Sequence, residues 1–151
     1  MKGRIEIRPV RVDDLRGIYL LGRDVFVSRS SPFTPPWNEA NLADAVAGDP
    51  GLSLVAASKK SIAGFIIVSL DESDGPPCAV IRWVCLRENK PTGLLTDMLR
   101  TLQSALAERK IEKMVIALPG ENSDLIEYYR NFGFTESNRF IMMENFSPKR
   151  S

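Results

Sequence analysis

Few side chains in this 151-residue sequence can act as acids or bases, because it contains no histidine. Without imidazole, Ser-His-Asp triads, Cys-His pairs and every histidine-based metal site are excluded, and we expect no metal. Tyrosine, threonine and the carboxylates remain, and two tyrosines lie next to each other at Tyr128 and Tyr129. A phenol with a pKa of ~10 stays protonated at neutral pH and can donate its proton or a hydrogen bond.

A second segment with chemical potential runs from Cys85 to Leu95 and joins an apolar strand to a helix. The start of a helix presents N–H groups without intrahelical partners and the positive end of the helix dipole, so an anion can bind there. Gly93 would let the backbone approach such an anion closely. The alternative is a capped helix start that binds nothing.

Together with the order of elements, these segments resemble the GCN5-related N-acetyltransferase (GNAT) family over nearly the whole chain. The later segment matches the family pattern Asn-x-x-(small/apolar)-x-x-(apolar)-Tyr-x-x-x-Gly-Phe at its key positions, which are Asn122, Tyr129, Gly133 and Phe134. The earlier segment resembles the family's Arg/Gln-x-x-Gly-x-Gly/Ala helix start.

The earlier segment also departs from the family pattern. Lys90 takes the Arg/Gln position and Gly93 the first glycine, but Leu95 stands where the family has Gly or Ala. Pro91 contributes no N–H, a loss that matters less if it is the first helical residue. Leu95 also fits the apolar stripe of the helix, so its presence has a purely structural explanation.

The resemblance implies a site for acetyl-CoA as co-substrate. The pyrophosphate would lie at the helix start, Asn122 would bond the pantetheine arm, and Tyr129 would protonate the departing thiolate. A main-chain N–H near Val84 or Cys85 would stabilise the oxyanion. The implied cofactor-binding residues are Val84, Cys85, Lys90, Thr92, Gly93, Leu94, Leu95, Asn122 and Tyr129.

The attacking amine must lose a proton, but both positions where the family carries a basic carboxylate hold other residues, Arg82 and Ala117. Glu88 and Glu121 lie at the ends of the same strands. They are candidates for a base that acts through water, or else solvated loop charges.

Two residues are candidates for binding the acceptor. Trp37 lies in Pro-Pro-Trp-Asn, which resembles a Pro-Trp segment of N-terminal protein acetyltransferases; it would line a peptide groove or anchor the core. Arg82 would bind an acidic group of the acceptor, or is a surface charge without a role.

Hydrophobic periodicity predicts the elements that must position these residues. Strands are expected over Arg4–Val10, Leu52–Ser58, Ile62–Leu70, Ala79–Leu86, Met114–Leu118 and Phe140–Phe146, and helices over Leu15–Phe26, Trp37–Ala47, Leu95–Lys110 and Ser123–Phe132. The third helix carries an apolar stripe of Leu95, Met98, Leu99, Leu102, Ala105 and Leu106. Its strand–helix–strand context predicts parallel strands.

We therefore expect an α/β fold: one acyl-CoA N-acyltransferase (GNAT) domain over residues 1–151. Its mixed central sheet should have splayed parallel central strands flanked by helices. Hydrophobic residues are 44% of the chain, charged residues 26%, and the net charge is +1, which offers no drive toward nucleic acid or membrane. Cys78 and Cys85 share one strand and cannot pair, which indicates reduced thiols and a cytoplasmic protein. The expected oligomeric state is a monomer or homodimer.

The sequence predicts an enzyme, an N-acetyltransferase that moves an acetyl group from acetyl-CoA to a primary amine. The acceptor would be a peptide N-terminus or a small-molecule amine, and attack would be direct, in a ternary complex. The alternative is a non-catalytic binding module of the same fold with a degenerate coenzyme A site. An unrelated α/β domain, whose Tyr-x-x-x-Gly-Phe segment arose by chance, is a third possibility.

Overall fold

The structure, a computed structural model, describes residues 4–26, 36–59, 61–73 and 75–137. The chain divides into two compact units, of which the first ends at Ala117 and the second begins at Leu118. Among the described residues, the first unit holds a sheet and three α-helices, and the second holds one α-helix. No helix among the described residues is long and apolar enough to cross a membrane.

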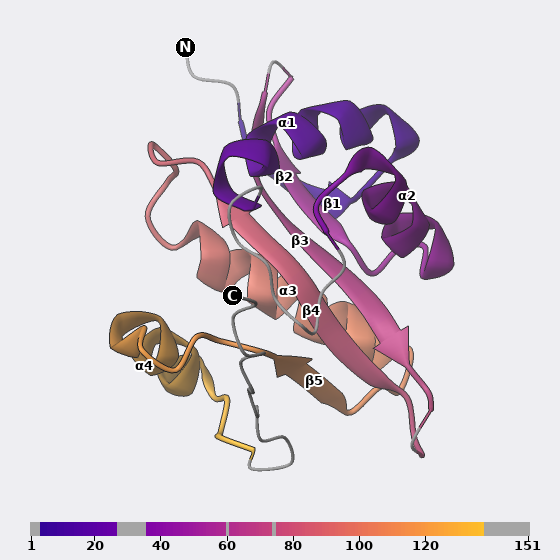
Figure 1. Cartoon of the computed structure of the whole chain (residues 1–151), viewed down its shortest axis with the longest axis vertical. Helices are drawn as coiled ribbons and strands as arrows, with labels where there is room; N and C mark the ends of the chain where they lie inside the picture. The colour runs from indigo at the N-terminus through magenta and orange to yellow at the C-terminus, as the bar shows by residue number, and fades with distance from the viewer. Residues whose placement is uncertain (1–3, 27–35, 60, 74, 138–151) are drawn as a thin grey trace, which may run out of the picture. The chain divides into compact units, whose positions relative to one another are not determined.

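The first unit is built on a five-stranded mixed sheet whose strands follow sequence order (Figure 1). The first four strands pair antiparallel, and the fourth and fifth pair parallel across an intervening helix, as the strand–helix–strand pattern predicted. The strands are β1 (Glu6–Pro9), β2 (Leu54–Ala57), β3 (Ile62–Asp71), β4 (Cys78–Leu86) and β5 (Lys113–Ile116).

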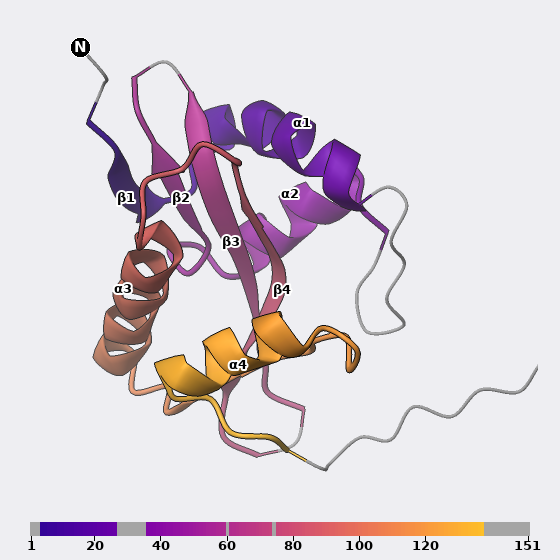
Figure 2. The same cartoon turned by 90° about the vertical axis from the view of Figure 1, so that its left-hand side faces the viewer.

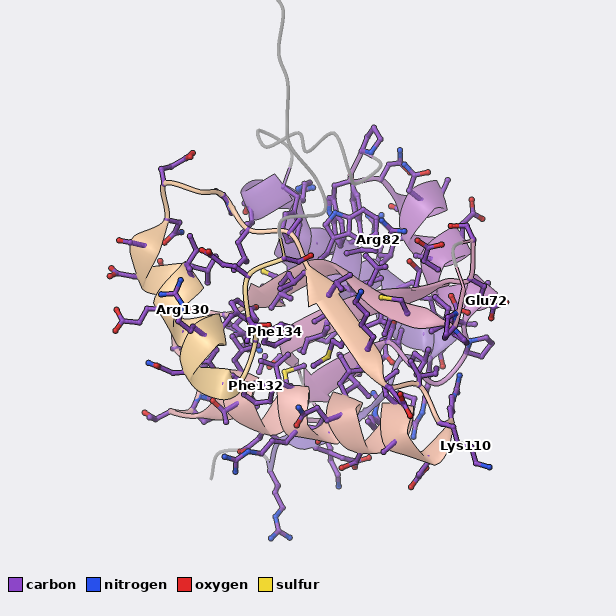
Figure 3. All side chains as sticks on the ribbon, turned by 90° about the horizontal axis from the view of Figure 1, so that it is seen from below. Glu72, Arg82, Lys110, Arg130, Phe132 and Phe134 are labelled. Atoms are coloured by element: carbon purple, nitrogen blue, oxygen red, sulfur yellow. The ribbon has the colours of Figure 1, made fainter. Side chains whose placement is uncertain are left out.

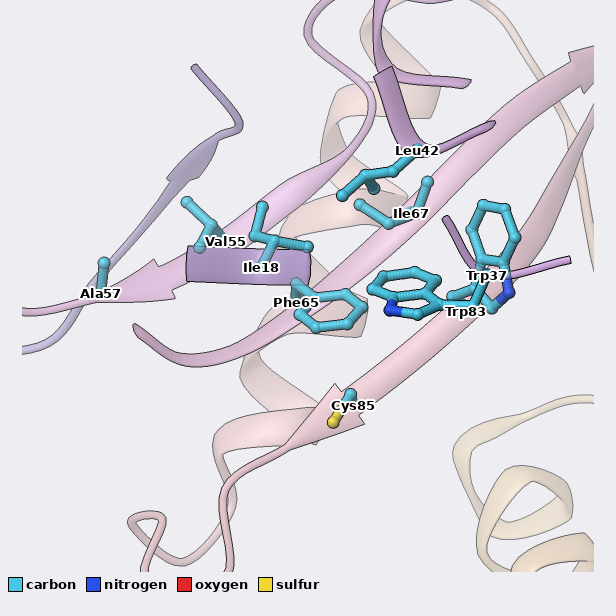
Figure 4. Packing of buried hydrophobic residues seen from close by; sticks show 9 residues of the cluster. All are labelled: Ile18, Trp37, Leu42, Val55, Ala57, Phe65, Ile67, Trp83 and Cys85. Carbon is cyan, nitrogen blue, oxygen red and sulfur yellow. The ribbon is translucent and has the colours of Figure 1, made fainter. Parts of the chain in front are cut away.

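Two helices cover one face of the sheet and a third covers the other (Figure 2). A 3-10 turn (Val12–Asp14) leads into α1 (Leu15–Phe26), which lies with α2 (Glu39–Gly48) on the first face, and Asn38 caps α2. The core on that face joins both helices to three strands (Figure 4). Its buried members are Ile18, Trp37, Leu42, Val55, Ala57, Phe65, Ile67, Trp83 and Cys85.

The opposite face is covered by α3 (Leu94–Glu108), whose buried stripe differs from the prediction at its start and at Ala105, which is half-buried. The buried residues are Leu94, Met98, Leu99, Leu102 and Leu106, whereas Leu95 is only half-buried. Leu94 lies four residues before Met98 on the same face, and Leu95 is turned by about 100° from Leu94. The packing explanation for Leu95 is therefore weaker than the sequence suggested.

The second unit contains α4 (Ser123–Phe132), and a capping residue at each end defines where this helix begins and ends. The side chain of Asn122 accepts a hydrogen bond from the N–H of Leu125, and Gly133 follows the last turn with a φ of 129°. Figure 3 labels Phe132 and Phe134 at this end of the helix. Both boundaries agree with the helix predicted over Ser123–Phe132. The strand expected over Phe140–Phe146 lies outside the described residues.

Candidate active site

The candidate site of the first unit centres on an irregularity in β4. Ile67 of β3 pairs with Trp83 of β4, but the next residue, Val68, pairs with Ile81. Arg82 is therefore an extra residue in β4, a β-bulge. The pairing of β4 with β5 also ends at Ile81, opposite Ile116, so β4 continues for five residues beyond its parallel partner and the two strands diverge (Figure 1).

The register shows which backbone groups face the divergence. The N–H of Arg87 donates to the carbonyl of Ala63 at 2.7 Å, so these two residues form a hydrogen-bonded pair. In an antiparallel ladder such pairs recur at every second residue, which assigns Cys85 and Trp83 to the same class. The N–H of Val84 consequently points away from β3, toward the side that β5 has left. Of the two positions predicted for an oxyanion donor, Val84 has the required direction and Cys85 does not.

The side chain of Cys85 belongs to the core instead. Its sulfur donates a weak hydrogen bond to the carbonyl oxygen of Leu21 in α1, 3.9 Å away. Burial raises the pKa of the Cys85 thiol, so it stays uncharged at neutral pH. Cys78 and Cys85 both lie on β4, and no disulfide joins them. Cys85 is buried, as expected, whereas Cys78 is only half-buried.

Arg82, the bulged residue, is half-buried and held by the neighbouring strand. Its Nε donates to the hydroxyl oxygen of Ser69 in β3 at 2.7 Å. Ser69 pairs with Val80, two residues before Arg82. The side chain of Arg82, which Figure 3 labels, is thus fixed against β3, and its residue follows the last pair of β4 with β5.

The start of α3 has the conformation that the glycine predicted. Gly93 is the N-cap residue with φ of 81° and ψ of 3°, a left-handed conformation that side chains with a Cβ rarely adopt. A Cβ placed there would meet no atom within 4 Å, so the backbone of Gly93 faces open space. The N-cap residue, a glycine, has no side chain that could cap this helix start. Its N–H groups are thus placed where an anion can approach them.

Pro91 lies outside the helix, in the turn that precedes it, so it is not the first helical residue. Its carbonyl oxygen accepts a hydrogen bond from the N–H of Leu94 at 3.3 Å. The turn places Thr92 and Gly93 at its centre, and Lys90 and Glu88 in the loop before it. Because Pro91 precedes α3 by three residues, its missing N–H removes no donor from the helix start.

In the second unit, Asn122, the residue predicted to bond the pantetheine arm, has a structural role. The side-chain oxygen of Asn122 caps α4 through the N–H of Leu125 at 3.1 Å. The bond uses the carbonyl side of the amide, whereas binding to another group would use its NH2. Asn122 and the nearby Glu121 are both exposed.

Tyr129 is 3% exposed and lies between two aromatic rings of its own unit. The rings of Tyr128 and Phe134 stand edge-on to it at centroid distances of 5.5 and 5.4 Å. The N–H of Phe134 also donates to the carbonyl of Tyr129 at 3.0 Å, beside a bond from Gly133. This is the Schellman arrangement, in which a glycine ends the helix and the next apolar residue packs back on it.

Burial raises the pKa of Tyr129 to about 12, and the proximity of Tyr128 adds to the rise. The phenol therefore keeps its proton throughout the neutral range. It is suited to donate a hydrogen bond, and unsuited to act as a base.

Trp37 lies in the core, where its side chain is 8% exposed. Its ring stacks on Phe65 at a centroid distance of 5.6 Å, and its Nε1 donates to the carbonyl of Tyr19 in α1. Gly22 makes room for it, because a Cβ there would lie 2.5 Å from the indole. Of the two explanations for Trp37, anchoring the core accounts for its position.

Two features of the site could not be recognised in the sequence. The bulge at Arg82 leaves no signal, because it depends on how two strands align. Ser69, which holds Arg82, is an ordinary residue of β3. Both come from the pairing register of β3 and β4.

Comparison with known proteins agrees with this fold. Among solved structures, the chain is similar to Ard1 from Thermoplasma volcanium, with a TM-score of 0.71 and 19% identity over 88% of this chain and 84% of that one. Arabidopsis thaliana Naa50, in complex with the bisubstrate analogue CoA-Ac-MVNAL, matches with a TM-score of 0.68 and 20% identity over 93% and 91%. The aminoglycoside N-acetyltransferase AAC(6')-Iy, in complex with CoA, matches with 0.71 and 18% over 96% and 97%.

These identities are low, so the structural matches show the fold alone. No curated protein sequence matches the chain. The model of the acetyltransferase (GNAT) family, however, matches residues 22–134, which is three quarters of the sequence. By this match, the chain belongs to the GNAT acetyltransferase family.

Proposed function

We propose that this protein is an acetyl-CoA-dependent N-acetyltransferase that acts on a primary amine by direct attack in a ternary complex. The observation that carries the proposal is the divergence of β4 from β5 beside the bulge, with the N–H of Val84 turned toward the gap. A backbone donor held rigidly in a sheet is suited to stabilise the negative charge that develops on a thioester oxygen.

The residues at the start of α3 fit the anionic end of coenzyme A. Gly93 exposes its backbone to open space, and the N–H groups of the first turn lie behind it. Lys90 and Thr92 are exposed in the preceding turn and would add a cation and a hydroxyl. We assign the pyrophosphate to this turn. Leu94 is buried, and half-buried Leu95 would contact the ligand through its N–H.

Tyr129 would donate a hydrogen bond to the sulfur as the carbon–sulfur bond breaks. The thiolate of a thiol of ordinary pKa, ~8.5, is a weaker base than the phenolate of Tyr129 by about 3.5 pKa units, equivalent to roughly 5 kcal/mol. Full transfer of the proton to the thiolate is therefore uphill while the phenol is buried. The elevated pKa favours hydrogen-bond stabilisation of the leaving thiolate over complete protonation by Tyr129.

The acceptor is a primary amine, and structures with this fold include complexes with a peptide-based and an aminoglycoside-based analogue or with CoA alone. For this chain we propose a peptide N-terminus or a small-molecule amine. Arg82 is the residue of the first unit that we assign to the acceptor side. Glu88 and Glu121 are exposed, and would act as bases only through intervening water.

Thermal unfolding with and without millimolar acetyl-CoA tests cofactor binding. Ligand at ~100 times its dissociation constant should stabilise the native state by ~2.7 kcal/mol, which is several degrees for a domain of this size. Release of coenzyme A thiol in the presence of an amine panel then tests transfer. Unfolding at the same temperature with and without ligand would support the alternative, a non-catalytic module of the GNAT fold.

A matched pair of glycine variants locates the site. Gly93→Ala should reduce the acetyl-CoA shift, because alanine strains the left-handed N-cap and places a methyl group in the open space. Gly48→Ala, at the end of α2, also meets no atom within 4 Å but has no positive φ, so it should leave the shift unchanged. Equal shifts in both variants would remove the turn before α3 from the cofactor site.

A further inference from the structure

The two strands that diverge at the candidate site carry no carboxylate. Neither β4 nor the segment from Lys113 to Gly120, which contains β5, includes an Asp or a Glu. The first acids that follow are Glu88 and Glu121, both exposed in loops. Within the described part of β4 and β5, the charged side chain next to the divergence is a cation, the half-buried Arg82.

The positive charge of Arg82 is fixed in place by β3. Its Nε donates to Ser69, and Asp71 of the same strand interacts with its charge. The pKa of the Asp71 carboxyl is lowered mainly by hydrogen bonds from Ser73, and in smaller part by Arg82. Asp71 is exposed, so water screens its influence on the site. On the other side, the charged residue of β5 is Lys113, which pairs with Cys78 at the far end of the strand.

We propose that the acceptor amine reacts after losing its proton to water, and that the site therefore selects weakly basic amines, above all peptide α-amino groups, over lysine side chains. The inference rests on the proposed function and narrows its substrate class. An amine that attacks at the divergence of β4 and β5 would lie near Arg82, the residue of β4 that follows the last pair with β5. A nearby positive charge disfavours a second one, so Arg82 would shift a bound amine toward its neutral, nucleophilic form.

The chemical step balances without a carboxylate on these strands. The ammonium first releases one proton to water. The nitrogen lone pair then forms a bond to the thioester carbonyl carbon, the carbon–sulfur bond breaks, and the sulfur leaves with the electron pair. The nitrogen releases its second proton and the sulfur takes one up, so that the products are an amide and a thiol.

The expected selectivity follows from the neutral fraction of each amine. At pH 7 an α-amine with a pKa of ~7.8 is ~14% neutral, whereas a lysine amine with a pKa of ~10.4 is ~0.04% neutral. The difference is roughly 300-fold. Because more basic amines are also stronger nucleophiles, we expect a preference in kcat/KM of at least about tenfold.

The test compares pH profiles for two acceptors, a peptide with a free N-terminus and the same peptide N-acetylated with one lysine. The profile of kcat/KM reports the free reactants, so its acid limb should follow the pKa of each free amine. The profile of kcat reports the ternary complex, and its acid limb should lie lower than that of the free amine. One acid limb common to both acceptors would reveal a base in the enzyme and overturn the proposal.

Arg82 is tested by three variants. Arg82→Gln should raise the midpoint of the acid limb of kcat by roughly 0.5 to 1 pH unit, the size expected when one nearby positive charge is removed from a partly hydrated site. Arg82→Lys should have the midpoint of the wild-type protein, since lysine keeps the positive charge. Arg16→Gln removes a charge from an exposed arginine of α1 and should leave the midpoint unchanged. An unchanged midpoint in Arg82→Gln would overturn the role of Arg82.

Failure of this inference is distinguishable from failure of the proposed function. A wild-type protein that transfers acetyl groups to lysine as readily as to α-amines contradicts the selectivity alone. If the wild-type protein transfers to no amine, the proposed function fails and the inference falls with it. If Arg82→Gln does not fold, the midpoint of Arg82→Lys and the comparison of the two acceptors in the wild-type protein still test the proposal.

Discussion

At the scale of single residues, Tyr129 is held by its own unit in a way that suits a hydrogen-bond donor. Its ring is fixed by Phe134 and Tyr128, and burial raises its pKa to about 12. We expect Tyr129→Phe to lower kcat by roughly ten- to a thousandfold, because the leaving thiolate loses its donor, with acetyl-CoA affinity nearly unchanged. Steady-state kinetics and a binding titration measure the two quantities.

The control for this variant is its neighbour, since Tyr128→Phe removes a hydroxyl from the half-buried ring beside it. Tyr128→Phe should retain most of the activity. Because Tyr129 loses its proton only near pH 12, its ionisation should cause no decline of kcat in wild-type protein below about pH 11. Unchanged turnover in Tyr129→Phe would remove this phenol from the mechanism.

At the scale of elements, a partly buried ion pair fixes β1 to the 3-10 turn before α1. The guanidinium of Arg8 meets the carboxylate of Asp14 through two hydrogen bonds of 2.7 and 2.9 Å, and the N–H of Arg11 adds a third. The hydrogen bond from Arg8 is the main cause of the lowered pKa of the Asp14 carboxyl. The pair therefore stabilises the fold fully at pH values above the pKa of Asp14 in the unfolded chain, ~3.9. This stabilisation is lost as the pH falls through the lower pKa that Asp14 has in the folded protein.

Asp14→Asn should accordingly lower the free energy of unfolding by ~2 kcal/mol at pH 7, since it leaves Arg8 without its charged partner. The difference from wild type should shrink at pH 3, where the wild-type carboxylate also begins to gain a proton. Urea unfolding at both pH values measures it. Arg16→Gln breaks an exposed ion pair with Glu39 and should cost less than ~1 kcal/mol. A loss for Asp14→Asn that is equal at both pH values would contradict this account.

The helices and strands themselves were largely predictable from the sequence, but the exact residues at which they begin and pair were not. Periodicity indicates α1, α3 and α4 because their buried faces recur at helical spacing, and a strand–helix–strand order implies that β4 and β5 are parallel. The buried stripe of α3 begins one residue earlier than predicted, because the turn at Gly93 sets where the helix starts.

The same limit applies to the candidate site. Gly93 and Gly133 are recognisable because a positive φ favours glycine. The bulge at Arg82 and the direction of the Val84 N–H depend on the register between β3 and β4, which no single strand specifies. The two roles weighed for Trp37 are separated only by the packing of Phe65 and Gly22 around it.

At the scale of the whole molecule, the proposed ligand-binding residues come from both compact units: the turn and start of α3 in the first, and Asn122 and Tyr129 in the second. Hydrogen exchange can test each unit by itself. Saturating acetyl-CoA should slow amide exchange both in the first turn of α3 and in the first turn of α4, because it stabilises the bound form of each segment.

Adenosine diphosphate separates the two contributions, because it carries a pyrophosphate but no pantetheine or thioester. It should protect the first turn of α3, where backbone N–H groups can bind an anion, and leave the first turn of α4 unchanged. Protection of α3 alone by acetyl-CoA as well would mean that Asn122 and Tyr129 do not engage the ligand. The anion site of the first unit would then stand, and the hydrogen bond to the leaving thiolate would have to come from another residue.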